Sequence, residues 1–352
     1  DKAKDVLETA CVKAALGDRF VTRELVVQVV SEMTGIPVED MMAPEGDPGR
    51  YEAALSSAVF GQPEAVAAVA DAVRRYRAGL SPVDKPIAAL LFCGPTGVGK
   101  TELAKAAARQ LFGSPGKLVY LNMSEFYDRH TASRLVGAPP GYIGSDAGGQ
   151  LTEPVRRKRH CVVLLDEIDK AHEEALLVVM QALDEGKLAD SSGKVADFRN
   201  TLVVMTTNVG WEAYLGVDPE DERAVEEAMR RCVEAVRLRL RPEFFNRVRV
   251  VPFRPLGRKV LAEIARAAVS DLLARARSRP GRPELQVECD PAVLQWLVER
   301  GYDPQLGARP MKRLVEEVIG SKLAFALSSS AASSCQSVRV VMGKDGPEVV
   351  LR

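Results

Sequence analysis

The expected fold is decided by Gly94-Pro95-Thr96-Gly97-Val98-Gly99-Lys100-Thr101. An apolar run, 87–93, precedes this stretch and a helix-forming run, 102–109, follows it, so the order is strand, glycine-rich loop, helix. The pattern G-x-x-x-x-G-K-[ST] lets successive backbone N–H groups turn toward phosphate oxygens at the start of a helix. Lys100 is expected to reach the β- and γ-phosphates, and the Thr101 hydroxyl to ligate Mg²⁺. The alternative is a chance glycine turn, which the agreement of motif and context disfavours.

A second apolar run, 161–165, ends in the acidic pair Asp166-Glu167. Such a run is typical of a central parallel strand, and α/β sheets bind ligands beyond the carboxyl ends of their strands. Asp166 is therefore expected to hold the Mg²⁺ hydration shell, and Glu167 to polarise the attacking water. Acidic residues also favour helix N-termini, but the phosphate loop upstream favours the catalytic interpretation.

The stretch Thr201-Leu202-Val203-Val204-Met205-Thr206-Thr207-Asn208 is expected to be another buried strand, and it ends in the polar Asn208. An amide at that strand tip can bind the attacking water or the γ-phosphate, although a polar residue there is more often only a turn residue. The polar stretch 188–199, rich in Asp, Ser, Gly and Lys, is expected to be a loop.

These patterns predict an α/β fold with a central, mainly parallel sheet flanked by helices, followed by a smaller α+β domain. We expect a helical lead-in over 1–50, a large nucleotide-binding subdomain over 51–254 and a small C-terminal subdomain over 255–352. The length of 352 residues allows this division. The chain begins with Asp1 rather than Met, which predicts a piece of a longer protein.

The composition is that of an ordinary globular protein. Lys plus Arg and Asp plus Glu both number 48, which gives no reason to expect a nucleic-acid or membrane partner. Six scattered cysteines without a C-x-x-C pair and only three histidines argue against a disulfide scaffold or a zinc site. No apolar stretch approaches the length of a membrane span, and no signal peptide opens the chain. We expect an intracellular protein, cytoplasmic in the first instance, with mitochondrion or plastid as alternatives.

Taken in order, these features resemble the AAA+ ATPases, and more narrowly the second nucleotide-binding domain of ClpB-type disaggregases in the Clp/heat-shock-100 family. The resemblance runs from about Thr22 to Leu327. The matching segments are 34–38, 61–66, 94–101, 137–144, 148–152, 166–167, 197–201, 241–247 and 301–309. The resemblance implies an AAA+ core that uses ATP and Mg²⁺, and a homo-oligomeric ring, expected to be a hexamer.

The resemblance also implies residue roles. Asn208 matches sensor 1, Arg309 matches sensor 2, and Arg247 matches the arginine finger that acts on a neighbouring subunit's nucleotide. Val59 and Phe60 match positions near adenine. The chain departs from the family at Arg249, where an acidic residue is usual.

The segment Gly137-Ala138-Pro139-Pro140-Gly141-Tyr142-Ile143-Gly144 holds one tyrosine among two prolines and three glycines. Its simplest interpretation is a surface turn. The resemblance implies instead that Tyr142, with Ile143, grips polypeptide in a central pore, and that 190–197 is a second pore loop. Unfolded or aggregated polypeptides are then the expected substrates, with a co-chaperone as a further partner.

Four functions are compatible with a nucleotide loop of this kind. The first is an ATP-driven disaggregase, and the second is an unfoldase that feeds a peptidase. The second relies on an Ile-Gly-Leu or Ile-Gly-Phe docking loop, where this chain has Tyr214-Leu215-Gly216-Val217, so disaggregation is preferred. The third, a nucleic-acid motor or clamp loader, would predict a basic, aromatic-rich face. The fourth, a structural protein without ATPase activity, is disfavoured by the joint presence of Lys100, Asp166, Glu167, Asn208, Arg247 and Arg309.

Overall fold

The computed structural model describes residues 2–17, 20–34, 38, 49–137, 148–277, 286–303, 306–328, 337–343 and 346–351. The chain forms two compact units. The larger comprises Asp1–Cys93, Gly99–Val209 and Val233–Pro252, and the smaller comprises Gly94–Val98, Gly210–Cys232 and Phe253–Arg352. The three-part division at residues 50 and 254 stays a prediction.

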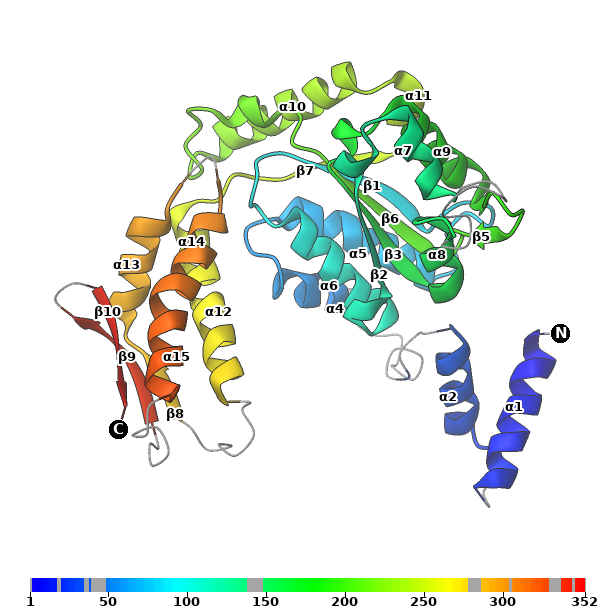
Figure 1. The fold of residues 1–352 in the computed structure, drawn as a ribbon, viewed down its shortest axis with the longest axis horizontal. Helices are drawn as coiled ribbons and strands as arrows, with labels where there is room; N and C mark the ends of the chain where they lie inside the picture. The colour runs from blue at the N-terminus through cyan, green and yellow to red at the C-terminus, as the bar shows by residue number, and fades with distance from the viewer. Residues whose placement is uncertain are drawn as a thin grey trace. The chain divides into compact units, whose positions relative to one another are not determined.

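The larger unit is built on a five-stranded sheet in the order β2-β3-β6-β1-β7 (Figure 1). Its strands are β1 (Ala88–Cys93), β2 (Leu118–Asn122), β3 (Cys161–Asp166), β6 (Thr201–Thr206) and β7 (Arg249–Pro252). Every neighbouring pair is parallel. Thr201 to Thr206 are all buried, as are the first five residues of β3, because helices cover both faces of a central parallel strand. The predicted parallel sheet is confirmed.

Several helices pack on this sheet, and α5 (Pro63–Arg77) begins where the sequence supplies a start signal. Pro63 at the first position of α5 lacks only an N–H that no helix bond would use. Helix α6 packs on β2, β3 and β6, while α5 packs on β7 (Figure 1). The helices up to β7 are α1 (Lys2–Leu16), α2 (Arg23–Thr34), α4 (Arg50–Ser56), α5 (Pro63–Arg77), α6 (Lys100–Phe112), α7 (Arg129–Ala132), α8 (Thr152–Lys158), α9 (Glu173–Glu185), α10 (Glu222–Arg239) and α11 (Pro242–Phe245).

Single helical turns join several of these elements. They are η1 (Pro115–Lys117), η2 (Met123–Phe126), η3 (Ser133–Leu135), η5 (Ile168–Lys170) and η6 (Trp211–Tyr214). Within the described ranges, none of the helices combines the length and the apolar character that crossing a bilayer requires.

The prediction of a loop over 188–199 was wrong. Two short antiparallel strands, β4 (Lys187–Ala189) and β5 (Val195–Asp197), form a ribbon there. Leu188 and Ala196 pair in register and are both buried, so one apolar position on each strand holds the ribbon against the domain. The Asp190 carboxylate closes the turn by accepting the backbone N–H groups of Ser192 and Lys194 at 2.9 and 2.8 Å.

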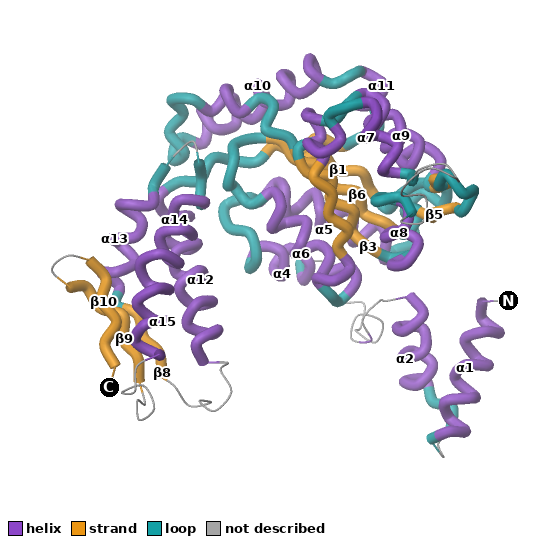
Figure 2. The backbone as a smooth tube through the Cα atoms, in the orientation of Figure 1, coloured by secondary structure: helices purple, strands orange, loops and turns teal. Residues whose placement is uncertain are grey.

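The smaller unit contains a mixed three-stranded sheet in the order β10-β9-β8. β9 (Ser337–Gly343) and β10 (Gly346–Leu351) form an antiparallel hairpin, and β8 (Gln286–Cys289) pairs in parallel with β9. Helices α12, α13 and α15 pack on this sheet (Figure 2). The helical segments are α12 (Arg258–Arg277), α13 (Pro291–Gly301), α14 (Arg309–Leu314), the π-helical turn η7 (Val315–Gly320) and α15 (Ser321–Ser328). The expected α+β character of this part is confirmed.

Candidate nucleotide site

The glycine-rich loop after β1 has a backbone that only glycine adopts easily. Gly94, Gly97 and Gly99 have φ angles of 124°, 71° and 108°, in the region where a Cβ causes steric conflict. A Cβ on Gly99 would also lie 3.0 Å from the Val59 Cγ1 atom. Val59 is therefore packed against the loop, and the glycine spacing of the motif has a steric reason in this fold.

Lys100 begins α6 and its side chain is almost completely buried. Its ammonium group donates hydrogen bonds to the Thr207 carbonyl oxygen at 3.0 Å and to Asn208 Oδ1 at 2.8 Å. The structure thus brings together two residues that lie 108 positions apart and were each predicted to face phosphate. Both of these acceptors are neutral, and a buried cation is suited to an anionic ligand, because an opposite charge would compensate its desolvation.

Asp166 lies at the carboxyl end of β3, where its carboxylate receives two hydroxyl groups. Thr206 Oγ1 donates to Asp166 Oδ1, and Tyr120 OH donates to Oδ2 at 3.2 Å. The pKa of Tyr120 is raised, first by burial and then by the Asp166 charge and hydrogen bond. A phenol with a raised pKa stays protonated at neutral pH and can therefore act as this donor.

Glu167 has an unusual backbone conformation. Its φ and ψ angles are 57° and 49°, and Arg159 is the other non-glycine residue with positive φ in the described ranges. The Glu167 N–H group donates to Thr206 Oγ1 at 3.0 Å. Left-handed non-glycine residues are strained and concentrate at functional sites. Thr206 therefore fixes both the Asp166 side chain and the Glu167 backbone through one hydroxyl.

Arg309 lies beside the first half of the glycine loop, in the same compact unit. It is the first residue of α14, and its Cγ atom would be 3.2 Å from a Cβ placed on Gly97. The preceding N–H group, of Ala308, donates to the Gly97 carbonyl oxygen at 3.0 Å. Gly307, which has a φ of +61° and no side chain, allows this backbone to come close to the glycine loop. The residue that matches sensor 2 is thus adjacent to the loop that matches the phosphate-binding motif.

This contact gives a stability prediction. In Gly307→Ala the new Cβ would lie 2.6 Å from the Thr96 carbonyl oxygen, so overpacking of about 1–3 kcal/mol adds to a left-handed penalty of about 1–2 kcal/mol. Gly216→Ala is the matched control, because Gly216 has a φ of +73° and no atom within 4 Å of its Cβ position. The free energy of unfolding, measured with denaturant, and the nucleotide affinity should both fall more in Gly307→Ala than in Gly216→Ala. Equal losses in the two variants would contradict the packing role of Gly307.

The hydrogen bonds of Arg247 go to Asp184 and Glu243 rather than to the residues of the nucleotide-loop cluster. Its Nε atom lies 2.7 and 2.6 Å from the Asp184 carboxylate oxygens, and its Nη1 group donates to the Glu243 carbonyl oxygen. Both side chains of the pair are about one-third exposed. Arg249, where the family usually has an acidic residue, pairs with Asp71 at 3.2 Å. The structure therefore does not bring Arg247 onto the nucleotide-loop cluster of its own chain.

The remaining predicted positions give less information. Val59 is buried and Phe60 is partly buried directly before α5, while Thr101 follows Lys100 in α6 and is partly exposed. Tyr142 and Ile143 lie outside the described residues, as does most of the segment 137–144.

The donor set fits a bound Mg²⁺ of a particular kind. Within the described ranges there is no group of three or more His, Cys, Asp or Glu side chains that could enclose a metal. Mg²⁺ commonly keeps several waters and binds through one or two carboxylates together with substrate phosphates. Asp166 and the Thr101 hydroxyl match that requirement. The Thr206 and Tyr120 hydroxyl groups occupy one acceptor site on each Asp166 oxygen, and each oxygen has a second lone pair that can accept from water.

Sequence reasoning missed two residues of this site, Tyr120 and Thr206, and it also missed Asp184, the ion-pair partner of Arg247. Thr206 interrupts an apolar run two positions before Asn208, so its polarity in a buried strand was a detectable signal. Tyr120 lies on β2, paired in parallel with β3, and needed the strand order to be connected with Asp166. Asp184 is one of many acidic residues on helices, and nothing in the sequence connects it with Arg247.

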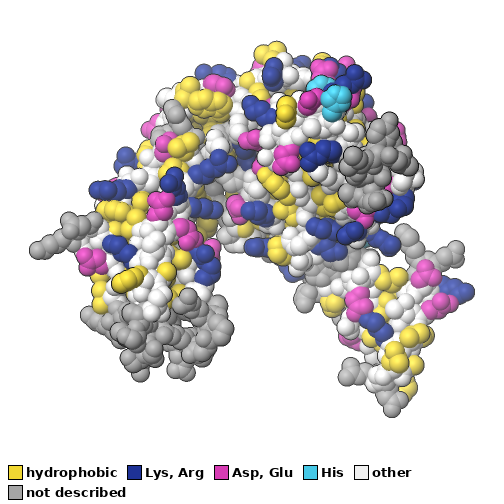
Figure 3. Space-filling view, in the orientation of Figure 1, with side chains coloured by type: hydrophobic (Ala, Val, Ile, Leu, Met, Phe, Trp, Pro, Cys, Tyr) yellow, Lys and Arg dark blue, Asp and Glu magenta, His cyan; other side chains and the backbone are white. Residues whose placement is uncertain are grey.

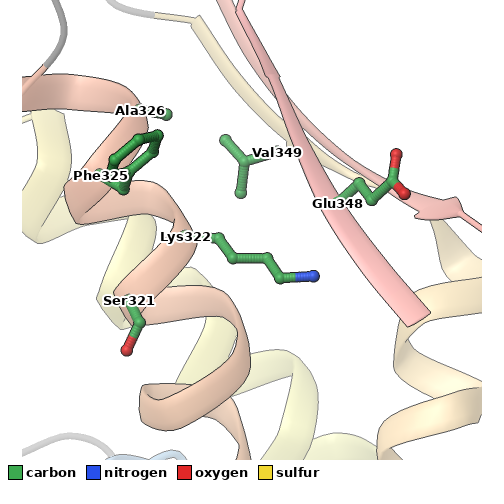
Figure 4. Close-up of a pocket in the computed structure, with 6 residues that line it drawn as sticks. All are labelled: Ser321, Lys322, Phe325, Ala326, Glu348 and Val349. Atoms are coloured by element: carbon green, nitrogen blue, oxygen red, sulfur yellow. The ribbon is translucent and has the colours of Figure 1, made fainter. Parts of the chain in front are cut away.

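A hollow of about 440 Å³ lies in the smaller unit between α15 and β10 (Figure 4). It is lined by Ser321, Lys322, Phe325, Ala326, Glu348 and Val349. The Lys322 ammonium group already donates to the Pro347 carbonyl oxygen at 2.7 Å, and the Phe325 ring is largely exposed. The hollow lacks the glycine loop and the paired carboxylates, so we do not assign the nucleotide to it.

Two family models match the chain in succession. The AAA domain (Cdc48 subfamily) matches residues 85–251, which contain the glycine loop, Asp166, Glu167, Asn208 and Arg247. The C-terminal, D2-small domain of ClpB protein matches residues 256–340. The fold and these matches therefore define the class of the protein: the chain is an AAA+ ATPase domain followed by its small C-terminal domain. Proteins of this class bind nucleotides.

Curated relatives place it more narrowly. The chaperone protein ClpB of Bacillus cereus is 43% identical over 334 residues, 94% of this chain and 38% of the relative. ClpB of Aquifex aeolicus is 44% identical over 338 residues, 94% of this chain and 33% of the relative. ClpB of Pseudomonas putida is 48% identical over 308 residues, 86% and 35% respectively. The chain fits the second nucleotide-binding domain of ClpB-type proteins with its small C-terminal domain, and it spans about a third of the length of these relatives.

A solved structure agrees with this placement. The closed-state cryo-EM reconstruction of Hsp104 with ATPγS and FITC casein matches with a TM-score of 0.79 and 31% sequence identity. The match covers 99% of this chain and 60% of the Hsp104 chain. The predicted family and fold class are confirmed.

Proposed function

We propose that this chain hydrolyses ATP and uses the energy to unfold or disaggregate polypeptides, as the motor part of a ring. The observation that carries the ATPase part is the hydrogen-bonded group at the carboxyl ends of β3 and β6. There, Lys100 bonds Asn208, and one Thr206 hydroxyl bonds both the Asp166 carboxylate and the Glu167 N–H group. These five residues come from three separate segments of the chain and converge where parallel sheets bind ligands.

Each residue in this group has a separate task in hydrolysis. The glycine-loop N–H groups and Lys100 bind and orient the phosphates, and Arg309 beside Gly97 adds a positive charge to the same loop. Glu167, with its backbone fixed in the left-handed region, accepts a proton from the attacking water. Asn208 orients that water or the γ-phosphate. Val59, packed on the loop, and Phe60 form part of the adenine environment.

Asp166 and Thr101 would hold Mg²⁺, which neutralises charge on the phosphates when it is bound. Thr206 and Lys100 hold Asp166 and Asn208 in place through hydrogen bonds, and both Thr206 and Lys100 are almost completely buried. Their burial keeps their donors from being solvated, so the hydrogen bonds to Asp166 and Asn208 are stronger than they would be in water.

Arg247 is proposed to act on the nucleotide of a neighbouring subunit. Its own chain gives it a surface ion pair with Asp184 rather than a contact with Lys100 or Asn208. An exposed ion pair contributes about 0–1 kcal/mol, so Arg247 can leave Asp184 for a phosphate at little cost. This proposal requires a homo-oligomeric ring, for which a hexamer is the expected form.

The polypeptide-remodelling part is supported by the relatives, whose names describe chaperones, and by the Hsp104 structure, whose description includes casein. Tyr142 and Ile143 are proposed to contact the polypeptide in the pore, and a co-chaperone is a further proposed partner. Figure 3 shows Lys and Arg side chains interspersed with Asp and Glu on the visible face, a distribution that favours a polypeptide over a nucleic-acid partner. We propose the cytoplasm as the compartment.

The second candidate, an unfoldase that feeds a peptidase, is less well supported. The stretch 214–217 would have to present a docking loop, but Tyr214 ends the helical turn η6 and is buried. Leu215 is exposed, so the weaker support rests mainly on the sequence Tyr214-Leu215-Gly216-Val217, which does not match an Ile-Gly-Leu or Ile-Gly-Phe docking loop.

The remodelling proposal is tested by Tyr142→Ala in the full-length protein. We expect basal ATP hydrolysis and the melting temperature to stay near parent values, while recovery of an aggregated reporter is lost. Tyr142→Phe should retain most of the recovery, because the ring supplies the contact area. Tyr127→Ala is the matched control, since Tyr127 is a highly exposed tyrosine of the larger unit. Normal recovery by Tyr142→Ala would leave an ATPase without the proposed output.

A further inference from the structure

Tyr120 has an unusual position for a tyrosine. It lies on β2, an edge strand of the five-stranded sheet, and about half of the side chain (51%) is exposed. In the parallel pairing of β2 with β3, Tyr120 is opposite Leu164, two residues before Asp166. The phenol ring spans that offset, and its hydroxyl reaches Asp166 Oδ2 at 3.2 Å. Within the described ranges this is the one side-chain hydrogen bond of Tyr120.

The two hydroxyl groups on Asp166 divide its carboxylate between them. Thr206 approaches Oδ1 from β6, and Tyr120 approaches Oδ2 from β2, so the donors come from the two strands on either side of β3. One donor would leave the carboxylate free to rotate about its Cβ–Cγ bond, whereas two donors on different oxygens fix the plane. Neither hydroxyl is charged, so the carboxylate retains its full negative charge for a cation.

We propose that Tyr120 is a positioning residue for Asp166. The Tyr120 hydroxyl fixes the plane of the Asp166 carboxylate, which would hold Mg²⁺. The inference rests on the proposed function, because it assumes that Asp166 is on the metal side of the nucleotide. A purely structural role is a poor explanation for Tyr120, since an edge-strand ring that is half exposed adds little to the core. The hydroxyl, rather than the ring, is therefore the part of the side chain that acts on the site.

The test is Tyr120→Phe in the full-length protein, which removes one oxygen and keeps the ring. ADP affinity is measured by calorimetry with Mg²⁺ and again with a chelator, and the melting temperature is measured without nucleotide. We expect the Mg²⁺-dependent gain in ADP affinity to fall by about three- to tenfold, the size expected for a part-exposed hydrogen bond to a charged group. Affinity without metal and the melting temperature should not change.

Tyr127→Phe is the matched control, because Tyr127 is 70% exposed and has no side-chain hydrogen bond in the described part of the chain. It should retain the full Mg²⁺-dependent gain. An unchanged gain in Tyr120→Phe, or an equal loss of affinity with and without Mg²⁺, would overturn the positioning role alone. A parent protein without any Mg²⁺-dependent gain would overturn the proposed function as well, so the two failures are distinguishable.

Discussion

Glu167→Gln is expected to stop ATP hydrolysis while the protein still binds ATP. The amide has the shape of the carboxylate, and the Thr206 hydrogen bond uses the Glu167 backbone N–H group, which the substitution does not remove. The left-handed backbone should therefore be preserved, and only the proton acceptor is lost. General-base catalysis contributes about 10²–10⁴-fold, so the turnover rate should fall by that factor, measured as phosphate release at saturating ATP.

Lys100→Ala provides the contrast for Glu167→Gln. It removes a buried ammonium group that bonds Asn208 and that we propose binds phosphate, so nucleotide affinity itself should fall. ATP binding by equilibrium dialysis separates the two variants: near-parent affinity for Glu167→Gln, and strongly reduced affinity for Lys100→Ala. Turnover by Glu167→Gln at the parent rate would mean that another group activates the water.

Arg247→Ala has the second large expected effect. An arginine that stabilises charge on the transferring phosphoryl group contributes about 10³–10⁵-fold to turnover, whereas the ion pair with Asp184 on the surface contributes about 0–1 kcal/mol to stability. We therefore expect a large loss of ATP turnover with little change in the melting temperature. Arg247→Lys should recover only a small part, because an ammonium group cannot form the planar, two-pronged contact of a guanidinium.

Arg249→Ala is the matched control for Arg247→Ala. Arg249 is also a partly exposed arginine in an ion pair of the larger unit, with Asp71, and has no predicted contact with nucleotide. Its substitution should leave turnover within about twofold, as expected for a surface change. Equal losses in the two variants would show that the region 247–249 acts through folding rather than through one guanidinium group.

The centre of the sheet was predictable because β1, β3 and β6 are largely apolar runs, and the chain after each of them leads directly into a polar or glycine-rich segment of the site. Asp166 and Asn208 mark two of those ends, and the glycine loop marks a third, so the strand tips could be placed together before the structure was known. The ribbon over 187–197 was not predictable, because only Leu188 and Ala196 are buried among polar residues. Two apolar positions in a polar stretch carry too little periodicity to indicate strands.

The interactions within the site were less predictable than its members. The left-handed backbone of Glu167 and its bond to Thr206 depend on how β3 and β6 are aligned, which the sequence does not state. The Tyr120 hydrogen bond depends likewise on the alignment of β2 with β3. The pairing of Arg247 with Asp184 joins residues 63 positions apart on the surface, where neither periodicity nor a motif gives a signal. Motifs identified the chemical groups, and the strand register determined their partners.

The central claim is that a complete site needs groups from two copies of the chain, and mixing inactive variants tests it most directly. A ring containing Arg247→Ala and Glu167→Gln subunits should regain hydrolysis above the Lys100→Ala blank. In such a ring, an Arg247→Ala subunit keeps Lys100 and Glu167 and receives Arg247 from a Glu167→Gln neighbour. The control mixture, Lys100→Ala with Glu167→Gln, should stay inactive because every subunit then lacks part of its own site. Recovered activity in the first mixture alone is the predicted result, and co-assembled rings without any recovery would contradict the account.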